Sequence, residues 1–281
     1  MKGKKYLELT RINHGLILAF AILTGQVIAL KSLPDATTFI VSALCGIFIQ
    51  TGSFVIGDFW DMQTDIANRR MDRPLARGVI RPKTAVDIAL ISFLIGFILA
   101  YTLNSVAFYI TVLFAILGVG YAYYLKNVAL VGNIVIAASM AVPFVFGAYA
   151  AAQTAPLAVW VIALITLLAG TGRELIKGVQ DLEGDKKTGR KTFAVLTGKH
   201  NTLFFAKAFI FLSIITSAVP FFYITEYYMD PLFLALMVIN AFIWTKAIWE
   251  SDKKKDLEKT RMETLYGMFV GTLAFLLGAV F

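Results

Sequence analysis

NVALVGNIVIAASMAVPFVFGAYAAAQTAPLAVWVIALITLLAGTG, residues 127–172, is a run of 46 residues that contains no Asp, Glu, Lys or Arg. A helix needs about 20 mostly apolar residues to cross the roughly 30 Å of hydrocarbon in a bilayer. The run is therefore long enough for two membrane-spanning helices. We expect the break between them at residues 153–156, QTAP, because proline is favoured at the start of a helix.

The whole chain has the composition of a membrane protein. Of its 281 residues, 58% are hydrophobic and only 16% are charged. A soluble domain carries about a quarter charged residues and just under half apolar ones. A water-soluble globule is therefore excluded, and so is a disordered chain, because the sequence contains 23 Phe and 11 Tyr. The single cysteine, Cys45, lies inside an apolar run, which excludes a disulfide framework and a cysteine metal site.

Six further charge-free runs occur, at 12–30, 36–57, 88–125, 208–225, 231–245 and 264–281. The run at 88–125 is long enough for two spans, with a turn expected at residues 103–105, LNS. The run at 231–245 reaches span length if the side chain of Lys246 extends toward the membrane surface and the helix continues to Trp249. We therefore predict one all-α domain over residues 1–281, a multi-pass bundle of nine transmembrane helices.

The basic residues predict the orientation of this bundle. With nine spans, 25 of the 26 Lys and Arg residues fall on the side of the N-terminus, and only Lys31 falls on the other side. Short loops rich in Lys and Arg face the cytoplasm. We expect a protein of the cell membrane with its N-terminus in the cytoplasm and its C-terminus outside. The formal net charge of +8 then reflects topology, so we expect no nucleic-acid partner.

Two acidic segments lie on the predicted cytoplasmic side. Residues 57–65 read GDFWDMQTD after the second span, and residues 174–185 read ELIKGVQDLEGD after the sixth. Each contains two aspartates four positions apart, a spacing that places both carboxylates on one face of a helix. These are the pairs Asp61/Asp65 and Asp181/Asp185.

The two pairs lie 120 residues apart, which suggests a duplicated four-span unit. The two repeats would cover about 12–126 and 127–249, followed by a last span at 262–281.

Like charges at this spacing destabilise a helix unless a cation lies between them. Mg²⁺ fits that position, because it is typically held by one or two carboxylates together with substrate phosphate oxygens. Charged, hydrated loops would explain one such pair, but they explain less well two pairs at matching helix ends. The sequence therefore predicts a magnesium and diphosphate site. Its candidate metal ligands are Asp58, Asp61, Asp65, Asp181 and Asp185, of which the four paired aspartates are the candidate catalytic residues.

Basic residues close to these pairs are candidates for contact with phosphate, because Arg can bind phosphate oxygens bidentately and Lys supplies a point charge. For each of them the alternative is a cation that only sets the topology. The candidates are Arg73, Arg77, Lys126, Arg173 and Lys177.

With these residues the chain resembles the UbiA-type superfamily of intramembrane prenyltransferases. That family carries N-D-x-x-D-x-x-x-D after its second span and D-x-x-x-D after its sixth, which GDFWDMQTD and DLEGD match except at Gly57, where the family usually has Asn. The segments NRRMDRPLARG and YAYYLKNVALVGN are also similar to the family's intervening motifs. The segment from Arg173 to Asp185 is most similar to the archaeal digeranylgeranylglyceryl phosphate synthase branch, although Gly178 and Gln180 replace two acidic positions of that pattern.

The resemblance implies transfer of a polyprenyl group, here geranylgeranyl, from its diphosphate to a lipophilic acceptor in the membrane. Mg²⁺ would assist departure of the diphosphate, and the acceptor would capture the allylic carbocation. Geranylgeranylglyceryl phosphate is the expected acceptor, and an aromatic acceptor of quinone or chlorophyll-type synthesis is the alternative. Asn13 and the hydroxyl of Tyr121 are expected to line the site. No protein partner is implied.

An ion-coupled membrane transporter is the non-enzyme alternative. Carriers usually keep ionisable groups near the middle of the bilayer. Here the apolar runs carry no charge and the acids gather at helix ends, which favours the enzyme.

Overall fold

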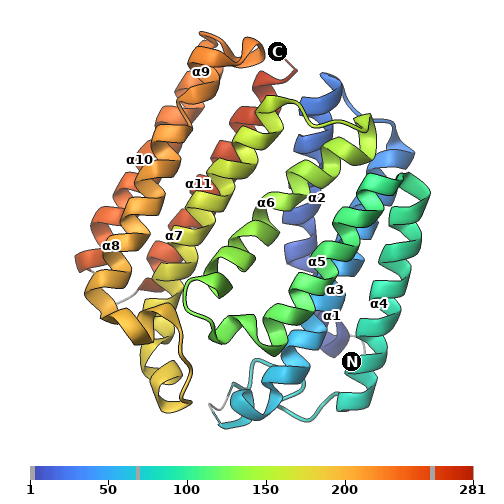
Figure 1. Ribbon diagram of the computed structural model, residues 1–281, viewed down its shortest axis with the longest axis vertical. Helices are drawn as coiled ribbons and strands as arrows, with labels where there is room; N and C mark the ends of the chain where they lie inside the picture. Colours follow the sequence, from blue (N-terminus) through green and yellow to red (C-terminus); the bar gives the residue numbers. More distant parts are fainter. Residues whose placement is uncertain (1–3, 68–69, 254–256, 281) are drawn as a thin grey trace.

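The computed structural model describes residues 4–67, 70–253 and 257–280, and these ranges contain helices and no strand (Figure 1). The prediction of an all-α fold is confirmed. The α-helices are α1 Lys4–Thr10, α2 Ile12–Leu30, α3 Ala36–Ala67, α4 Pro82–Leu103, α5 Ser105–Tyr123, α6 Val131–Ala152, α7 Leu157–Lys187, α8 Phe193–Thr216, α9 Val219–Tyr223, α10 Pro231–Lys253 and α11 Leu257–Gly278. Two short 3-10 turns lie at Leu125–Asn127 and Thr225–Tyr227.

Seven of the described helical segments are long and apolar enough to cross a membrane, and two shorter apolar helices accompany them. The chain is therefore a multi-pass membrane protein. The seven segments are Ala36–Ile66, Pro82–Leu103, Ser105–Tyr123, Val131–Ala152, Leu157–Lys187, Phe193–Tyr223 and Pro231–Glu250, and the two shorter helices are His14–Leu30 and Met262–Gly278.

Both predicted breaks within the long apolar runs are confirmed. Asn104 separates α4 from α5 in an extended conformation, and its side chain accepts a hydrogen bond from the N–H of Ala107 at 2.9 Å. This is the N-cap arrangement that satisfies a free donor of the first turn. The second break lies between Ala152 and Leu157, where Pro156 precedes the first residue of α7.

Two helices are longer than the charge-free runs indicate. α3 has 32 residues and α7 has 31, so both continue through their acidic segments. At a rise of about 1.5 Å per residue, each is about 47 Å long. Charged side chains end an apolar run, but they do not end a helix. The spacing of four between paired aspartates is therefore a helical spacing in the structure.

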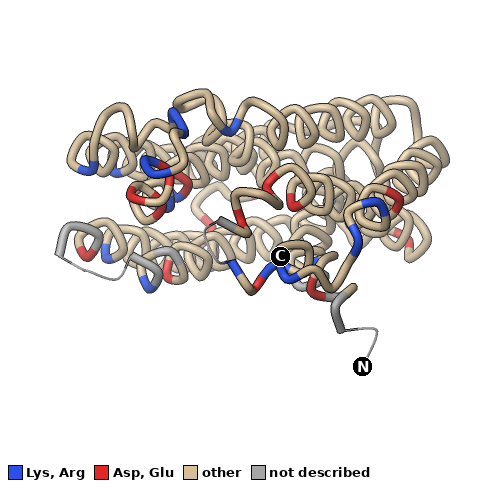
Figure 2. The backbone as a smooth tube through the Cα atoms, turned by 90° about the horizontal axis from the view of Figure 1, so that it is seen from below, with Lys and Arg blue, Asp and Glu red and all other residues tan. Residues whose placement is uncertain are grey.

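The acidic ends of α3 and α7 lie at the same end of the bundle as α1, at the bottom of Figure 1, whereas α11 ends near the top. Figure 2 views this lower end and shows acidic and basic segments gathered across it. Lys31, the one cation predicted for the other side, forms an ion pair with Glu226 at 2.6 Å. The hydrogen bond from Lys31 lowers the pKa of Glu226, so this carboxylate stays ionised at neutral pH.

The backbones of α2 and α6 touch, and glycine allows this contact. A Cβ added at Gly25 would overlap the carbonyl oxygen of Phe144, and one added at Gly147 would overlap that of Ile22. Because the obstacle is backbone rather than a flexible side chain, a larger residue must push the helices apart. The pair α2–α6 therefore depends on these glycines.

We expect Gly25→Ala to lower the free energy of unfolding by about 1–3 kcal/mol, the usual effect of overpacking. Thermal unfolding of the purified protein in detergent would measure it. Gly120→Ala is the matched control, because its added Cβ would meet only the Cδ1 of Leu125, at 3.8 Å. There we expect no loss, and up to about 1 kcal/mol of gain from helix propensity. Equal melting temperatures for Gly25→Ala and the unsubstituted protein would contradict the role given to this contact.

Candidate active site

A cavity of about 1700 Å³ opens at the lower end of the bundle and continues between the helices. On α3, the residues that line the cavity run from Asp65 back to Cys45. At the standard rise of an α-helix they extend over about 30 Å. The lining is charged at the outer end. Deeper in, it includes apolar side chains such as Ile49, Phe114 and Phe146. One space thus joins a polar site to a long apolar chamber.

The two acidic pairs face this same cavity, although they lie 120 residues apart in the sequence. Lys126 Nζ contacts Asp61 Oδ1 at 2.7 Å, and Arg190 Nη2 contacts the same oxygen at 2.8 Å. Arg190 Nη1 also lies 3.7 Å from Asp185 Oδ1. A single guanidinium therefore bridges an aspartate of α3 and an aspartate of α7. Asp65 and Asp181 line the cavity beside them.

Asp58, the fifth predicted metal ligand, is only 6% exposed and lies next to two arginines. Its Oδ1 accepts hydrogen bonds from Arg11 and from Arg73, the latter at 2.9 Å. Its other oxygen, Oδ2, is buried and accepts no hydrogen bond in the described part of the chain. Buried carboxylate oxygens are normally satisfied. Asp58 therefore anchors two arginines at the cavity wall and keeps one oxygen for a further ligand.

The oxygen-rich donor set fits Mg²⁺ in one particular way. Within the described residues no three His, Cys, Asp or Glu side chains converge on one point as a closed metal site would require. Mg²⁺ dehydrates reluctantly and is usually bound by one or two carboxylates, with water and phosphate oxygens completing its octahedron. Carboxylates spread over two opposite helix ends, beside several cations, suit a metal that arrives with a phosphate-bearing substrate.

Four of the five predicted basic residues line the cavity: Arg73, Lys126, Arg173 and Lys177. Arg173 Nη1 and Lys177 Nζ both contact Glu174, at 3.0 Å and 3.6 Å. The fifth, Arg77, is exposed, forms an ion pair with Glu8 and is not among the residues that line the cavity.

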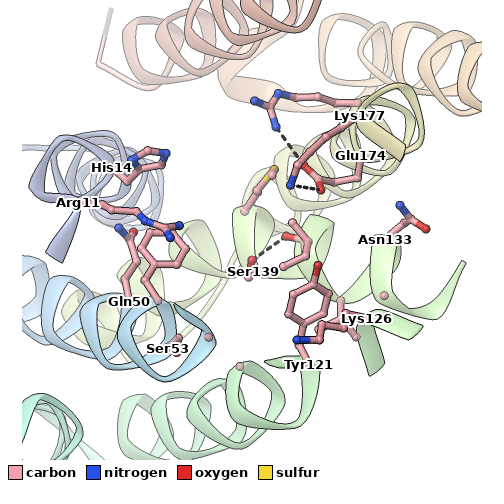
Figure 3. A pocket seen from close by; sticks show the side chains of 18 of the residues that line it. Arg11, His14, Gln50, Ser53, Tyr121, Lys126, Asn133, Ser139, Glu174 and Lys177 are labelled. Carbon is pink, nitrogen blue, oxygen red and sulfur yellow. Dashed lines mark hydrogen bonds and ion pairs between the residues drawn. The ribbon is translucent and has the colours of Figure 1, made fainter. Parts of the chain in front are cut away.

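Two polar candidates complete the predicted set. Tyr121 lines the cavity. Figure 3 shows it beside Lys126, with Arg11 and His14 at another edge of the pocket and Glu174 with Lys177 at a third. The side chain of Asn13 lies outside the described part of the structure.

Sequence reasoning missed several charged residues of the cavity. Arg11, Arg70, Asp72, Glu174 and Arg190 all line it, yet none belongs to the pattern of paired aspartates. At the mouth, the hydrogen bond from Arg70 lowers the pKa of Asp72, so that both remain charged. Only Arg190 had a usable signal, because the glycine before it is typical of a helix C-terminus and predicts that the chain turns back there.

Residues 18–273 match the model of the UbiA prenyltransferase family. Digeranylgeranylglyceryl phosphate synthase from Archaeoglobus fulgidus is 28% identical over 98% of this chain and 97% of its own length. A solved structure concerning digeranylgeranylglyceryl phosphate synthase in membranes has a TM-score of 0.81 at 28% identity and covers 99% of both chains.

A second solved structure is similar at the level of the fold. It is a UbiA homologue from Archaeoglobus fulgidus bound to GPP and Mg²⁺, with a TM-score of 0.71 at 20% identity, covering 96% of this chain and 99% of its own. The family model spans most of the sequence, and both structural matches extend over almost the whole fold. The chain belongs to the UbiA prenyltransferase family.

Proposed function

We propose that this protein is a Mg²⁺-dependent intramembrane prenyltransferase that transfers a geranylgeranyl group from its diphosphate to geranylgeranylglyceryl phosphate, in archaeal ether-lipid synthesis. One observation carries the proposal: aspartate pairs from α3 and α7 lie at the charged end of a single cavity whose deeper walls are apolar. Such a cavity can hold a diphosphate and a long hydrocarbon chain at the same time. The related synthase and the GPP- and Mg²⁺-bound homologue support the same reaction.

The residues of the cavity have distinct roles in this reaction. Asp61, Asp65, Asp181 and Asp185 would hold Mg²⁺, with Asp58 as a further ligand. Bound there, Mg²⁺ would neutralise the diphosphate and make it a better leaving group. Lys126 and Arg73 bind phosphate oxygens. The apolar walls exclude water, which would otherwise capture the allylic carbocation before the acceptor. The hydroxyl oxygen of Tyr121 stabilises the positive charge on the reacting carbon, and Asn13 stays a prediction of the sequence for the same role.

Arg173 and Lys177 suit the phosphate of the acceptor rather than the diphosphate. They precede Asp181 on α7 by eight and four residues, about 12 Å and 6 Å along a helix. Both line the cavity beside the buried carboxylate of Glu174. A diphosphate held by the aspartate pairs would lie nearer to Asp181, so these two cations are placed to contact the anionic headgroup of a second substrate. Arg77 remains a more distant candidate for phosphate contact.

The reaction can be tested with the purified protein, geranylgeranyl diphosphate and Mg²⁺. Either geranylgeranylglyceryl phosphate or an aromatic acid is supplied as acceptor, and the product is identified by mass spectrometry. We expect prenylation of geranylgeranylglyceryl phosphate. A prenylated aromatic acid would instead support an acceptor of quinone or chlorophyll-type synthesis. If no prenyl diphosphate reacts or binds, the enzyme reading fails and an ion-coupled transporter becomes the better proposal.

The proposed topology is nine spans, with the N-terminus and the active site facing the cytoplasm and the C-terminus outside. The proposal counts the two shorter apolar helices as crossings in addition to the seven longer segments. The one-sided distribution of Lys and Arg supports the orientation. The division into two repeats, about 12–126 and 127–249, stays a prediction that rests on the matched acidic pairs.

We expect opposite accessibility for the loop before α3 and for the C-terminal end of α7. In a Cys45→Ala background, a membrane-impermeant thiol reagent should label Ser32→Cys in intact cells and Lys187→Cys only after permeabilisation. Both positions are exposed, so burial does not mask the difference. Labelling of Lys187→Cys in intact cells would reverse the proposed orientation.

A further inference from the structure

Arg190 holds the two acidic pairs together through one side chain. Its Nη2 lies 2.8 Å from Asp61 Oδ1, and its Nη1 lies 3.7 Å from Asp185 Oδ1. Lys126 Nζ contacts the same oxygen of Asp61 at 2.7 Å. Two cations thus occupy a carboxylate that the proposed function gives to Mg²⁺. A metal ion can bind this oxygen only if it displaces or outcompetes them.

The backbone of Arg190 is fixed while its side chain is long. Gly189 has a φ of +71°, a left-handed conformation that ends α7, and the N–H of Arg190 donates to the carbonyl of Asp185 at 3.0 Å. The Arg190 side chain is about a quarter exposed and reaches the cavity wall from this turn. It can therefore change partners by rotation about its own bonds, without moving α7.

Electrostatics makes such a change of partner favourable. Carboxylates four residues apart on a helix repel each other unless a positive charge lies nearby, and Arg190 with Lys126 supplies that charge. A divalent cation bound to Asp61 would lie within a few ångströms of Arg190 and Lys126, and it would repel both of these cations. A diphosphate bound to the metal offers new anionic oxygens nearby, and a guanidinium binds phosphate bidentately.

We propose that Arg190 is a counter-ion that exchanges partners: it neutralises Asp61 and Asp185 before the metal binds, and it turns to the diphosphate once Mg²⁺ takes Asp61. The inference rests on the proposed function. It makes Arg190 a competitor of the metal when diphosphate is absent and a ligand of diphosphate when the metal is present. Metal and diphosphate then bind synergistically, and linkage requires each to raise the affinity of the other by the same factor.

Arg190→Gln separates the two roles, because they predict effects of opposite sign. Without diphosphate the variant should bind the metal more tightly, since a competitor is gone. With saturating metal it should bind diphosphate more weakly, since a ligand is gone. Lys186→Gln is the matched control. It removes one positive charge from the last turn of α7, but Lys186 contacts exposed Glu183 and does not line the cavity. Arg190→Lys keeps the positive charge but lacks the two terminal nitrogens with which a guanidinium binds phosphate bidentately.

The experiment titrates purified full-length protein with Mn²⁺, observed by electron paramagnetic resonance, with and without inorganic pyrophosphate. For the unsubstituted protein we expect pyrophosphate to tighten Mn²⁺ binding by about tenfold or more, within the usual range of coupling between sites. For Arg190→Gln we expect Mn²⁺ alone to bind about fivefold more tightly, pyrophosphate to bind about tenfold more weakly, and the coupling factor to shrink accordingly. Arg190→Lys should lie between the two, and Lys186→Gln should match the unsubstituted protein.

Two results would overturn the inference. If the unsubstituted protein shows the coupling but Arg190→Gln does not bind Mn²⁺ more tightly, Arg190 does not compete with the metal. If Lys186→Gln has the same effect as Arg190→Gln, the effect is one of general charge rather than of the contact with Asp61. Failure of the unsubstituted protein to bind Mn²⁺ and pyrophosphate is a different outcome, which would overturn the proposed function as well. Should Arg190→Gln not fold, the comparison of Arg190→Lys with Lys186→Gln decides the question by the same signs.

Discussion

Asp61→Ala is expected to lower kcat for prenyl transfer by about a hundredfold to a thousandfold, the size of effect seen when a preorganised electrostatic group is removed from a reaction centre. Asp61 lies where the acidic ends of α3 and α7 meet, in contact with both Lys126 and Arg190. Its loss removes a proposed metal ligand. It also leaves two cations without their shared carboxylate, so they would repel the metal from the site that remains.

Turnover of geranylgeranyl diphosphate at saturating Mg²⁺ measures this effect. A melting curve and gel-filtration profile in detergent establish that the variant is folded. Glu183→Ala is the matched control, because it removes an acid that lies between Asp181 and Asp185 on α7 but whose side chain is 79% exposed and contacts Lys186. We expect near-normal turnover from the control. Near-normal turnover from folded Asp61→Ala would reject the proposed metal site.

Asp181→Ala is expected to cause a loss of similar size from the opposite wall of the cavity. Asp181 lines the cavity mouth on α7, one helical turn before Asp185. If the two acidic pairs hold one metal–diphosphate unit, removal of either pair disrupts the whole unit. Residues that act as a unit in catalysis give strongly non-additive losses.

The double variant Asp61→Ala/Asp181→Ala should therefore be little slower than either single variant. The measurement is kcat/KM for the four proteins of the double-mutant cycle, compared as free energies. If the losses simply add, the two pairs act independently, and a diphosphate clamped between them is the wrong description. Lower turnover in one single variant only would assign the metal to that helix alone.

Much of the fold was predictable because membrane helices leave simple traces in a sequence. The apolar runs predicted the helices, and Asn104 and Pro156 marked the two hidden breaks, since each has a local role at a helix start. Hydropathy failed at the ends of α3 and α7. There the helices continue through charged residues. A charged residue marks the end of the apolar environment, but the backbone hydrogen bonds of the helix can continue beyond it.

The aspartate pairs were predictable because each pair shows its spacing within one segment. Arg11 and Arg190 were not, although they contact Asp58 and Asp61 directly. These arginines approach from segments 47 and 129 residues away. Among many cations that set the topology, nothing local distinguishes Arg11, and the glycine before Arg190 indicates only that the helix ends there. Only the packing of α2, α3 and α7 around one cavity identifies the arginines that face the acids.

The length of α3 and α7 has a consequence for the fate of the products. Each helix is about 47 Å long, against roughly 30 Å of hydrocarbon, so their acidic ends extend to the aqueous edge of the bilayer. A diphosphate released there enters water, while the doubly prenylated lipid stays in the oil-like phase. Because their solubilities differ, the two products separate between the water and the bilayer as soon as they form. This partition opposes the reverse reaction without a gate or any other moving part.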